Sequence, residues 1–177
     1  MSNNKLLRLA LLTLLLVSPL ARAEKADRDK PVYLEADNVV VDDAKQVSVY
    51  TGKVVITQGT LMIRGDKVTV WQDNGAFDHG TVIGQPAYFR QKRDNSEEYV
   101  QGWAQRIDYN AKDNKADLYT QAKVKNGEDE VHGDVIHYDA NTEHYQVEGG
   151  QRNSATPGSG RVRAVIQPKN KDTKPAP

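Results

Sequence analysis

Apolar residues recur at every second position along most of the chain, and residues 36–58 show this pattern most clearly. Two alternating runs in this stretch are separated by a polar tip at residues 42–45, and the second run continues past Gly52. The apolar positions are Val39, Val41, Val47, Val49, Val54 and Ile56. Such an alternation puts one face of a β-strand on a core and leaves the other to solvent. Because Asp hydrogen-bonds its own backbone and tolerates turns, the stretch predicts two strands joined by a tight return.

The same unit recurs three more times. The copies begin at residues 36, 65, 104 and 133, which are 29, 39 and 29 residues apart, and a polar tip follows the first strand of each copy. The apolar pairs at the same place in each copy are Val39/Val41, Val68/Val70, Ile107/Tyr109 and Ile136/Tyr138. Any all-β chain alternates apolar and polar residues and turns often. Here, however, the apolar pair and the polar tip recur at the same places in every copy, which favours a repeat architecture. In such an architecture each unit buries its apolar face against its neighbours.

No stretch after residue 23 shows the 3.6-residue period of a helix, so the sequence predicts an almost wholly antiparallel β domain. The first and last strands are expected at residues 32–36 and 161–166. The polar residues 91–98 predict an exposed hairpin loop, and Asn126-Gly127 is a strong hairpin turn.

The first 23 residues are typical of a cleaved secretory signal peptide. Lys5 and Arg8 supply positive charge, residues 6–17 are mostly apolar, and Ala21-Arg22-Ala23 is a small-x-small cleavage site. The apolar run is shorter than the ~20 residues that a membrane-spanning helix needs. We therefore expect an exported protein with a single domain over residues 24–167 and a disordered, Lys- and Pro-rich tail over residues 168–177.

The net charge and the cysteine content further narrow the classes of function that the protein can have. The full chain has 24 basic and 24 acidic side chains; without Lys5, Arg8 and Arg22 the balance is 21 to 24, a net charge of −3. This balance argues against a nucleic-acid partner, because no basic excess is available to neutralise phosphates. The chain has no cysteine, so a disulfide cannot support the fold and a thiolate metal site is excluded.

No catalytic motif stands out, and we expect neither enzymatic activity nor a cofactor. The four histidines do not form a motif, although His137 and His144 flank the last polar tip and could meet across it as half of a metal site. Solvent-exposed strand histidines are the simpler interpretation, so no metal site is predicted. The Asp- and Asn-rich tips do not have the spacing of an EF-hand, and turn formation explains them.

Small residues interrupt the expected strands at recurrent places. These residues are Gly52, Gly65, Gly84, Ala87, Gly102, Gly133 and Gly149. Glycine inside a strand marks a bulge, a bend or a close approach, so a sheet bent at these positions can fold over on itself. The sequence leaves two possibilities open. The inner faces of the sheet could close as a core, or they could stand apart as an apolar trough for a long hydrophobic ligand.

Four stretches resemble a known family. They are residues 31–37 (PVYLEAD), 50–60 (YTGKVVITQGT), 64–68 (RGDKV) and 84–89 (GQPAYF), and they occur in the order found in the LptA (OstA-like) family of periplasmic lipopolysaccharide-transport proteins. The resemblance covers residues 31 to about 166. The third and fourth repeats match by pattern more than by identity, and the loop at residues 90–98 is longer than in the better-known members.

The resemblance implies an all-β fold, an open, twisted antiparallel β-jellyroll of two facing sheets built from degenerate repeats. It also implies a periplasmic carrier that holds the acyl chains of lipopolysaccharide in an apolar trough and stacks end to end. Its partners would be an inner-membrane-anchored component and an outer-membrane component of related β-fold. The expected trough residues are Val32, Leu34, Val41, Val49, Ile56, Val68, Phe89, Ile107, Tyr109, Leu118, Ile136 and Tyr138. The expected end-to-end contacts are Val32, Leu34, Val162, Ala164 and Ile166.

A secreted β-sandwich that binds polysaccharide, such as an adhesin module, is the alternative. Sites of that kind present exposed aromatic platforms, and Trp71 and Trp103 are the two tryptophans available to form one.

Overall fold

The structure, a computed structural model, describes residues 30–93, 96–150 and 160–168. These residues form ten β-strands and no helix. The strands are β1 (Tyr33–Glu35), β2 (Asn38–Asp42), β3 (Val47–Gln58), β4 (Leu61–Asp73), β5 (Ala76–Lys92), β6 (Tyr99–Asn110), β7 (Lys115–Asn126), β8 (Asp129–Asp139), β9 (His144–Glu148) and β10 (Arg163–Val165). The expected signal peptide and residues 169–177 of the expected tail lie outside the described residues.

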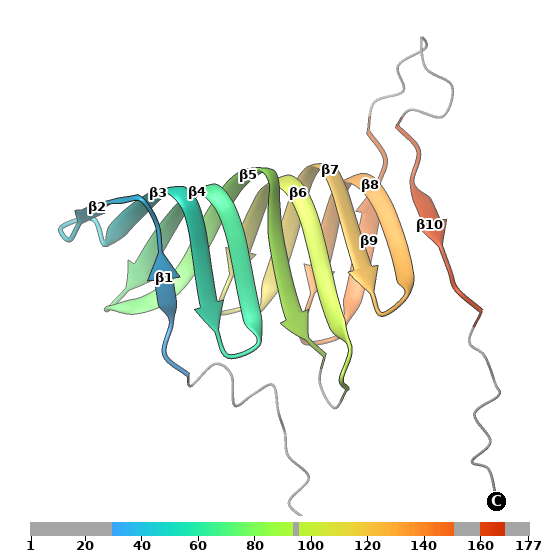
Figure 1. The fold of residues 1–177 in the computed structure, drawn as a ribbon, viewed down its shortest axis with the longest axis horizontal. Helices are drawn as coiled ribbons and strands as arrows, with labels where there is room; N and C mark the ends of the chain where they lie inside the picture. The colour runs from blue at the N-terminus through green and yellow to red at the C-terminus, as the bar shows by residue number, and fades with distance from the viewer. Residues whose placement is uncertain (1–29, 94–95, 151–159, 169–177) are drawn as a thin grey trace, which may run out of the picture.

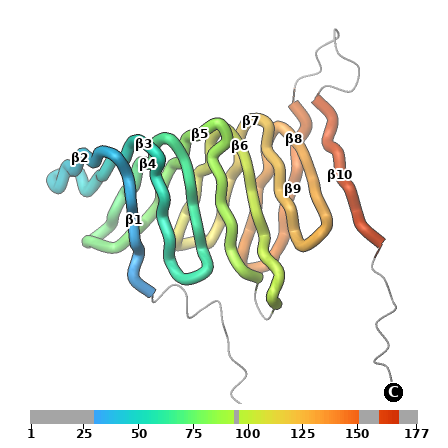
Figure 2. Tube along the Cα trace, viewed as in Figure 1, coloured from blue at the N-terminus to red at the C-terminus, as the bar shows by residue number. Residues whose placement is uncertain are grey.

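All ten strands belong to one continuous antiparallel sheet that folds over into two layers. Its order is β1-β3-β4-β5-β6-β7-β8-β10, while β2 pairs with β3 and β9 pairs with β8. The pairing of the short strands shows how the two layers arise. The first half of β3 pairs with β2, and its second half pairs with β1. In the same way β10 and β9 pair with the first and second halves of β8. Each long strand from β3 to β8 therefore contributes one half to each layer, as Figures 1 and 2 show.

The bend between the layers follows a line of irregular pairings at the same level of successive strands. Register shifts occur after Thr51, Arg64, Ile83, Trp103 and Tyr119. Such bulges bend a strand and increase its twist. At β3 the bulge uses Gly52 (φ 83°) and Lys53 (φ 47°), and at β7 it uses Thr120 (φ 66°) and Gln121 (φ 55°). The expected bend at Gly84 is confirmed, but the bend in β7 contains no glycine.

The first layer, which includes β2 and β9, presents two rows of side chains to the interior. The middle row takes one residue from each of eight strands: Val39, Tyr50, Val68, Val82, Ile107, Leu118, Ile136 and Val147. The rim row lies closer to the hairpin tips: Val41, Ser48, Val70, Gly80, Tyr109, Ala116, Tyr138 and Tyr145. The four apolar pairs of the sequence repeat occupy equivalent places in β2, β4, β6 and β8, which confirms the repeat.

The second layer, which includes β1 and β10, presents a corresponding row. This facing row consists of Leu34, Ile56, Ile63, Phe89, Gly102, Val124, Val131 and Ala164. The core lies between the layers, and the side chains of Ile107, Leu118 and Ile136 are almost completely buried there. The predicted all-β, open, antiparallel fold is thus confirmed, with the two facing sheets joined as one folded sheet.

Val49 is an exception to the expected inner face. Its neighbours Ser48 and Tyr50 face the interior, where Ser48 is buried and Tyr50 packs against the core. Because successive side chains of a strand alternate, Val49 points outward, opposite Val40 and Thr69. The prediction that Val49 lines the trough is therefore wrong. The hydrophobic alternation led to the error because valines occupy the outward positions there and a serine occupies an inward one.

Candidate functional site

The interior between the layers is the candidate site. Most of the predicted trough residues lie there: Leu34, Ile56, Val68, Phe89, Ile107, Tyr109, Leu118, Ile136 and Tyr138 all belong to the inner rows or pack on them. Val32 and Val41 lie at the β1/β2 end of the molecule and are exposed, because no further strand of the described residues covers them. Together these side chains form an apolar surface that runs the length of the sheet.

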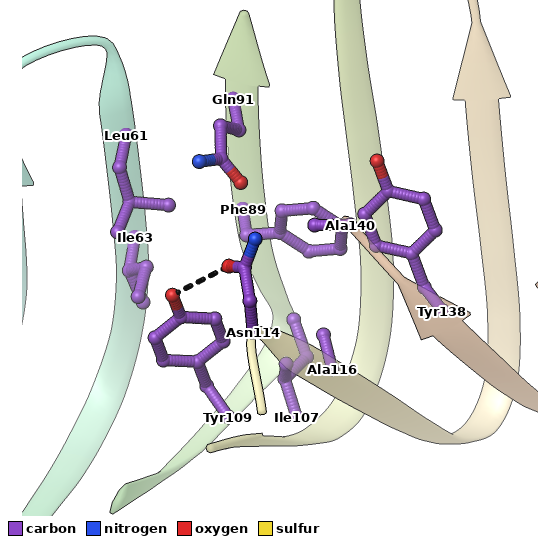
Figure 3. Close-up of a pocket in the computed structure, with 10 residues that line it drawn as sticks. All are labelled: Leu61, Ile63, Phe89, Gln91, Ile107, Tyr109, Asn114, Ala116, Tyr138 and Ala140. Carbon is purple, nitrogen blue, oxygen red and sulfur yellow. Dashed lines mark hydrogen bonds between the residues drawn. The ribbon is translucent and has the colours of Figure 1, made fainter. Parts of the chain in front are cut away.

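The two layers pack closely where they meet near the hairpin tips. A small cavity near the hairpin tips has a volume of about 10 Å³, which is about the room that one water molecule needs. Leu61, Ile63, Phe89 and Gln91 line it from the second layer, and Ile107, Tyr109, Asn114, Ala116, Tyr138 and Ala140 line it from the first (Figure 3). The rings of Phe89 and Tyr138 lie 6.2 Å apart between their centroids. A ligand larger than a water molecule therefore needs the two layers to move apart before it can occupy this cavity.

Asn114 organises the rim of the first layer. It is buried, it has a φ of 54°, and its Oδ1 accepts a hydrogen bond of 3.0 Å from the hydroxyl of Tyr109 (Figure 3). Its Nδ2 donates to Oδ1 of Asn141 in the neighbouring hairpin tip at 3.3 Å. Its carbonyl accepts from the backbone N–H of Ala140 at 3.0 Å. Asparagine is favoured at such a left-handed turn position, but its link to the next hairpin could not be predicted from sequence spacing.

The hairpin tips of the two layers lie on the side opposite the bend, and we call this side the mouth (Figure 1). An ion pair spans it. Arg93, which follows β5, donates from Nη2 to Oε2 of Glu143 at 2.6 Å and from Nε to Oε1 at 3.3 Å. Arg93 also donates from Nη1 to Oε2 of Glu98 at 3.0 Å. The hydrogen bond to Glu143 is the main cause that raises the pKa of Arg93, so the guanidinium stays charged.

Within the described residues, no further strand pairs with either end of the folded sheet. At the first end, β1 and β2 are the last strands of their layers, and the side chain of Val40 is 69% exposed. At the other end Ala164 lies opposite Val131, while Val162 and Ile166 flank β10 and are exposed. The expected edge strands are shorter than predicted. The structure adds β2 and β9 as further edges, which the sequence analysis did not consider.

The histidines do not form the hypothetical half-site. The register puts His144 opposite Asp139 and His137 opposite Gln146, so His137 and His144 are not cross-strand partners. Nδ1 of His137 instead lies 2.7 Å from Oδ1 of Asp117. Across the described residues, no three His, Asp or Glu side chains lie close enough together to hold a metal ion. The same part of the chain contains no helix that is long and apolar enough to cross a membrane.

The tryptophans do not share a surface. Trp71 stacks on His79 at 4.6 Å on the outer side of the first layer. Trp103 packs beside Tyr88 on the outer side of the second layer, where the ammonium group of Lys123 lies 4.8 Å from the centre of its ring. They therefore do not form the single aromatic platform that a polysaccharide site would use.

Comparison with known proteins agrees with this architecture. Residues 33–144 match the family described as LptA/(LptD N-terminal domain) LPS transport protein. The chain belongs to this family. The lipopolysaccharide export system protein LptH of Pseudomonas aeruginosa is 35% identical over 161 residues, which cover 90% of this chain and 92% of LptH. LptA of Escherichia coli K12 is 34% identical over 140 residues, which cover 77% of this chain and 75% of that protein.

The family relationship extends to the three-dimensional structure. The crystal structure of Pseudomonas aeruginosa LptH, described as the periplasmic component of the lipopolysaccharide transport device, matches with a TM-score of 0.72 and 32% identity. The match covers 80% of this chain and 99% of that structure. The relatives are export and transport proteins rather than enzymes, and the comparison favours the transport family over the adhesin alternative.

Proposed function

We propose that this protein carries lipopolysaccharide across the periplasm and holds its acyl chains between the two layers. The observation that carries the proposal is the pair of apolar surfaces that face each other, the middle row from β2 to β9 and the facing row from β1 to β10. Together they form a continuous path from one end of the folded sheet to the other. Membership in a family of lipopolysaccharide-transport proteins supplies the identity of the ligand.

Apolar side chains suit acyl chains because burying hydrocarbon against hydrocarbon contributes ~25 cal/mol per Å² removed from water. The resting interior buries its own surface in the same way, so loading exchanges contacts between the layers for contacts with lipid. This exchange keeps the acyl chains and the inner rows out of water during transport.

The test is binding of lipopolysaccharide to the purified protein, compared with binding of the core sugar from which the lipid has been removed. The proposal expects saturable binding of the intact glycolipid and no binding of the sugar alone. Binding of the delipidated sugar with the same affinity would contradict the carrier function and favour a polysaccharide-binding module.

We further infer that copies assemble head to tail. The outer edges of β1 and β2 at the first end, and of β9 and β10 at the other end, have no partner strand among the described residues and can continue both layers into a second copy by strand addition. Two different complementary surfaces give a contact that need not close and can extend as a filament. The family description also covers the N-terminal domain of LptD, so a domain of related sequence exists that could dock at an end by the same pairing. An inner-membrane-anchored component of related fold would occupy the opposite end.

A further inference from the structure

The ion pair across the mouth links two loops that are far apart in the sequence. Arg93 leaves β5 in the second layer, and Glu143 precedes β9 in the first layer, fifty residues later. Other salt bridges between described residues, such as Lys112–Asp78 and Lys123–Glu130, join side chains within one layer. Among the salt bridges that the described residues make, Arg93–Glu143 is the one that joins the two layers at the mouth.

Loading the trough has to break this contact. The cavity between the layers near the mouth has room for about one water, so an acyl chain enters there only when the layers separate. The side chains of Arg93 and Glu143 are 28% and 33% exposed. Ion pairs in contact with water contribute little net stability, because solvent screens them and competes for the same groups. The contact is thus one that a competing anion can replace.

A phosphate group is such a competitor. The planar guanidinium group presents parallel N–H donors that fit a carboxylate or a phosphate in the same two-point geometry. Phosphate offers three acceptor oxygens and more negative charge than a carboxylate. The sugar headgroup of a lipopolysaccharide carries phosphates next to its acyl chains, so a headgroup at the mouth would bring a phosphate close to Arg93.

We propose that Arg93 recognises a phosphate on the lipid headgroup and that this phosphate replaces Glu143 on Arg93 when the mouth opens. The inference rests on the proposed function as a lipid carrier. It assigns Arg93 a role in substrate specificity, because a lipid without the anionic group cannot make the exchange. Glu98 keeps its hydrogen bond of 3.0 Å and holds the guanidinium in place during the exchange.

The exchange also favours the open state. Once phosphate occupies Arg93, the released carboxylate of Glu143 faces a group of like charge, and the repulsion drives its hairpin tip away. A ligand shifts a conformational equilibrium only when it binds the two states with different affinity. Here the difference arises because Arg93 is available to phosphate only in the open state.

The first experiment compares two lipids with identical acyl chains, one phosphorylated and one enzymatically dephosphorylated. Arg93→Gln should lower the affinity for the phosphorylated lipid by about tenfold, as expected for the loss of one charge-assisted bidentate contact. Its affinity for the dephosphorylated lipid should not fall, because that lipid makes no ionic contact with Arg93 and loss of the ion pair to Glu143 only eases opening. Lys92→Gln is the matched control, because it removes a neighbouring cation whose salt bridge to Glu97 stays within the same loop.

The second experiment measures opening directly. Since the chain has no cysteine, spin labels at Lys125→Cys in the second layer and Gln146→Cys in the first report the separation of the layers. Glu143→Gln should increase the population of long distances without lipid, whereas Glu97→Gln should not. The phosphorylated lipid should lengthen the distance in the wild type. Inorganic phosphate should lengthen it less, because it brings no acyl chain to fill the opened space.

The outcomes separate the two proposals. If the wild type binds neither lipid, the carrier function itself fails. If the wild type binds both lipids and Arg93→Gln weakens both equally or neither, the carrier function stands and phosphate recognition by Arg93 is overturned. If Glu143→Gln leaves the distances unchanged, the ion pair does not hold the mouth closed.

Discussion

The ring of Phe89 occupies the space that a side chain on Gly102 would need. The two residues lie opposite each other on β5 and β6, in the facing row, and a Cβ on Gly102 would overlap the ring of Phe89 and lie 2.9 Å from Cδ2 of Leu118. Because Gly102 has no side chain, it leaves room for an aromatic ring from the neighbouring strand. From the sequence, a glycine inside a strand indicates a bulge, a bend or a close approach; at Gly102 the structure shows a close approach, and the bend lies elsewhere.

The first prediction tests this packing. Gly102→Ala should destabilise the protein by ~1–3 kcal/mol, as overpacking of a filled core does. The double variant with Phe89→Leu should lose less unfolding free energy than the sum of the losses in the two single variants, since the smaller side chain makes room. Gly80→Ala is the control on the inner face, because its nearest contacts would be 3.3 Å or more. Denaturant unfolding measures all four variants, and additive effects would show that Phe89 and Gly102 are not coupled.

The second prediction concerns the trough. Phe89→Asp places a carboxylate between the layers, where burial without a partner costs several kcal/mol or forces protonation. We expect lipopolysaccharide affinity to fall more than tenfold at a temperature where circular dichroism still shows folded strands. Val55→Asp on the outer side of β3 is the control and should bind like the wild type. If a folded Phe89→Asp variant bound lipopolysaccharide as well as the wild type does, Phe89 would not line the trough.

The repeat and the inner faces of β4, β6 and β8 could be predicted because hydrophobic alternation reports directly which face is buried. The same rule failed in the first half of β3, where Val47 and Val49 face outward and Ser48 faces inward. The bend was predictable where glycine marks it, as at Gly52. It was not predictable at Thr120 and Gln121, which adopt positive φ without glycine. The ion pair at the mouth was also beyond sequence reasoning, because no local pattern connects residues fifty positions apart.

The third prediction tests head-to-tail assembly. Removing residues 161–177 deletes β10 and exposes the first half of β8. The truncated chain should remain folded, because β10 has exposed side chains and the core lies elsewhere. Light scattering over a range of concentrations should then show that self-association is lost. Assembly equal to that of the full chain would place the contact at another surface.

The fourth prediction concerns pH. The hydrogen bond from Lys123, followed by that from His132, holds the pKa of Glu130 below its usual 4.5. Lys112, followed by His79, lowers the pKa of Asp78 in the same way. A carboxyl whose pKa is lower in the folded state stabilises the fold above its unfolded pKa and loses that contribution as pH falls through its folded value. Stability should therefore decline as the pH drops below about 4.5.

Lys123→Gln should make this decline shallower. The difference in unfolding free energy between this variant and the wild type should be present at pH 7 and shrink toward pH 3. Lys67→Gln on β4 removes a charge far from Glu130 and should leave the slope unchanged. A slope for Lys123→Gln equal to that of the wild type would mean that the pair does not contribute to acid sensitivity.

The folding of one sheet into two layers also sets a length. Each layer contains eight strands side by side, and strands in a sheet lie ~4.8 Å apart, so one copy provides roughly 34 Å of trough. Every long strand crosses both layers, so inserting one more hairpin would lengthen both layers together by ~10 Å and leave both ends unchanged. Under the proposed head-to-tail assembly, the apolar path would therefore lengthen by whole hairpins within a molecule and by whole molecules beyond it.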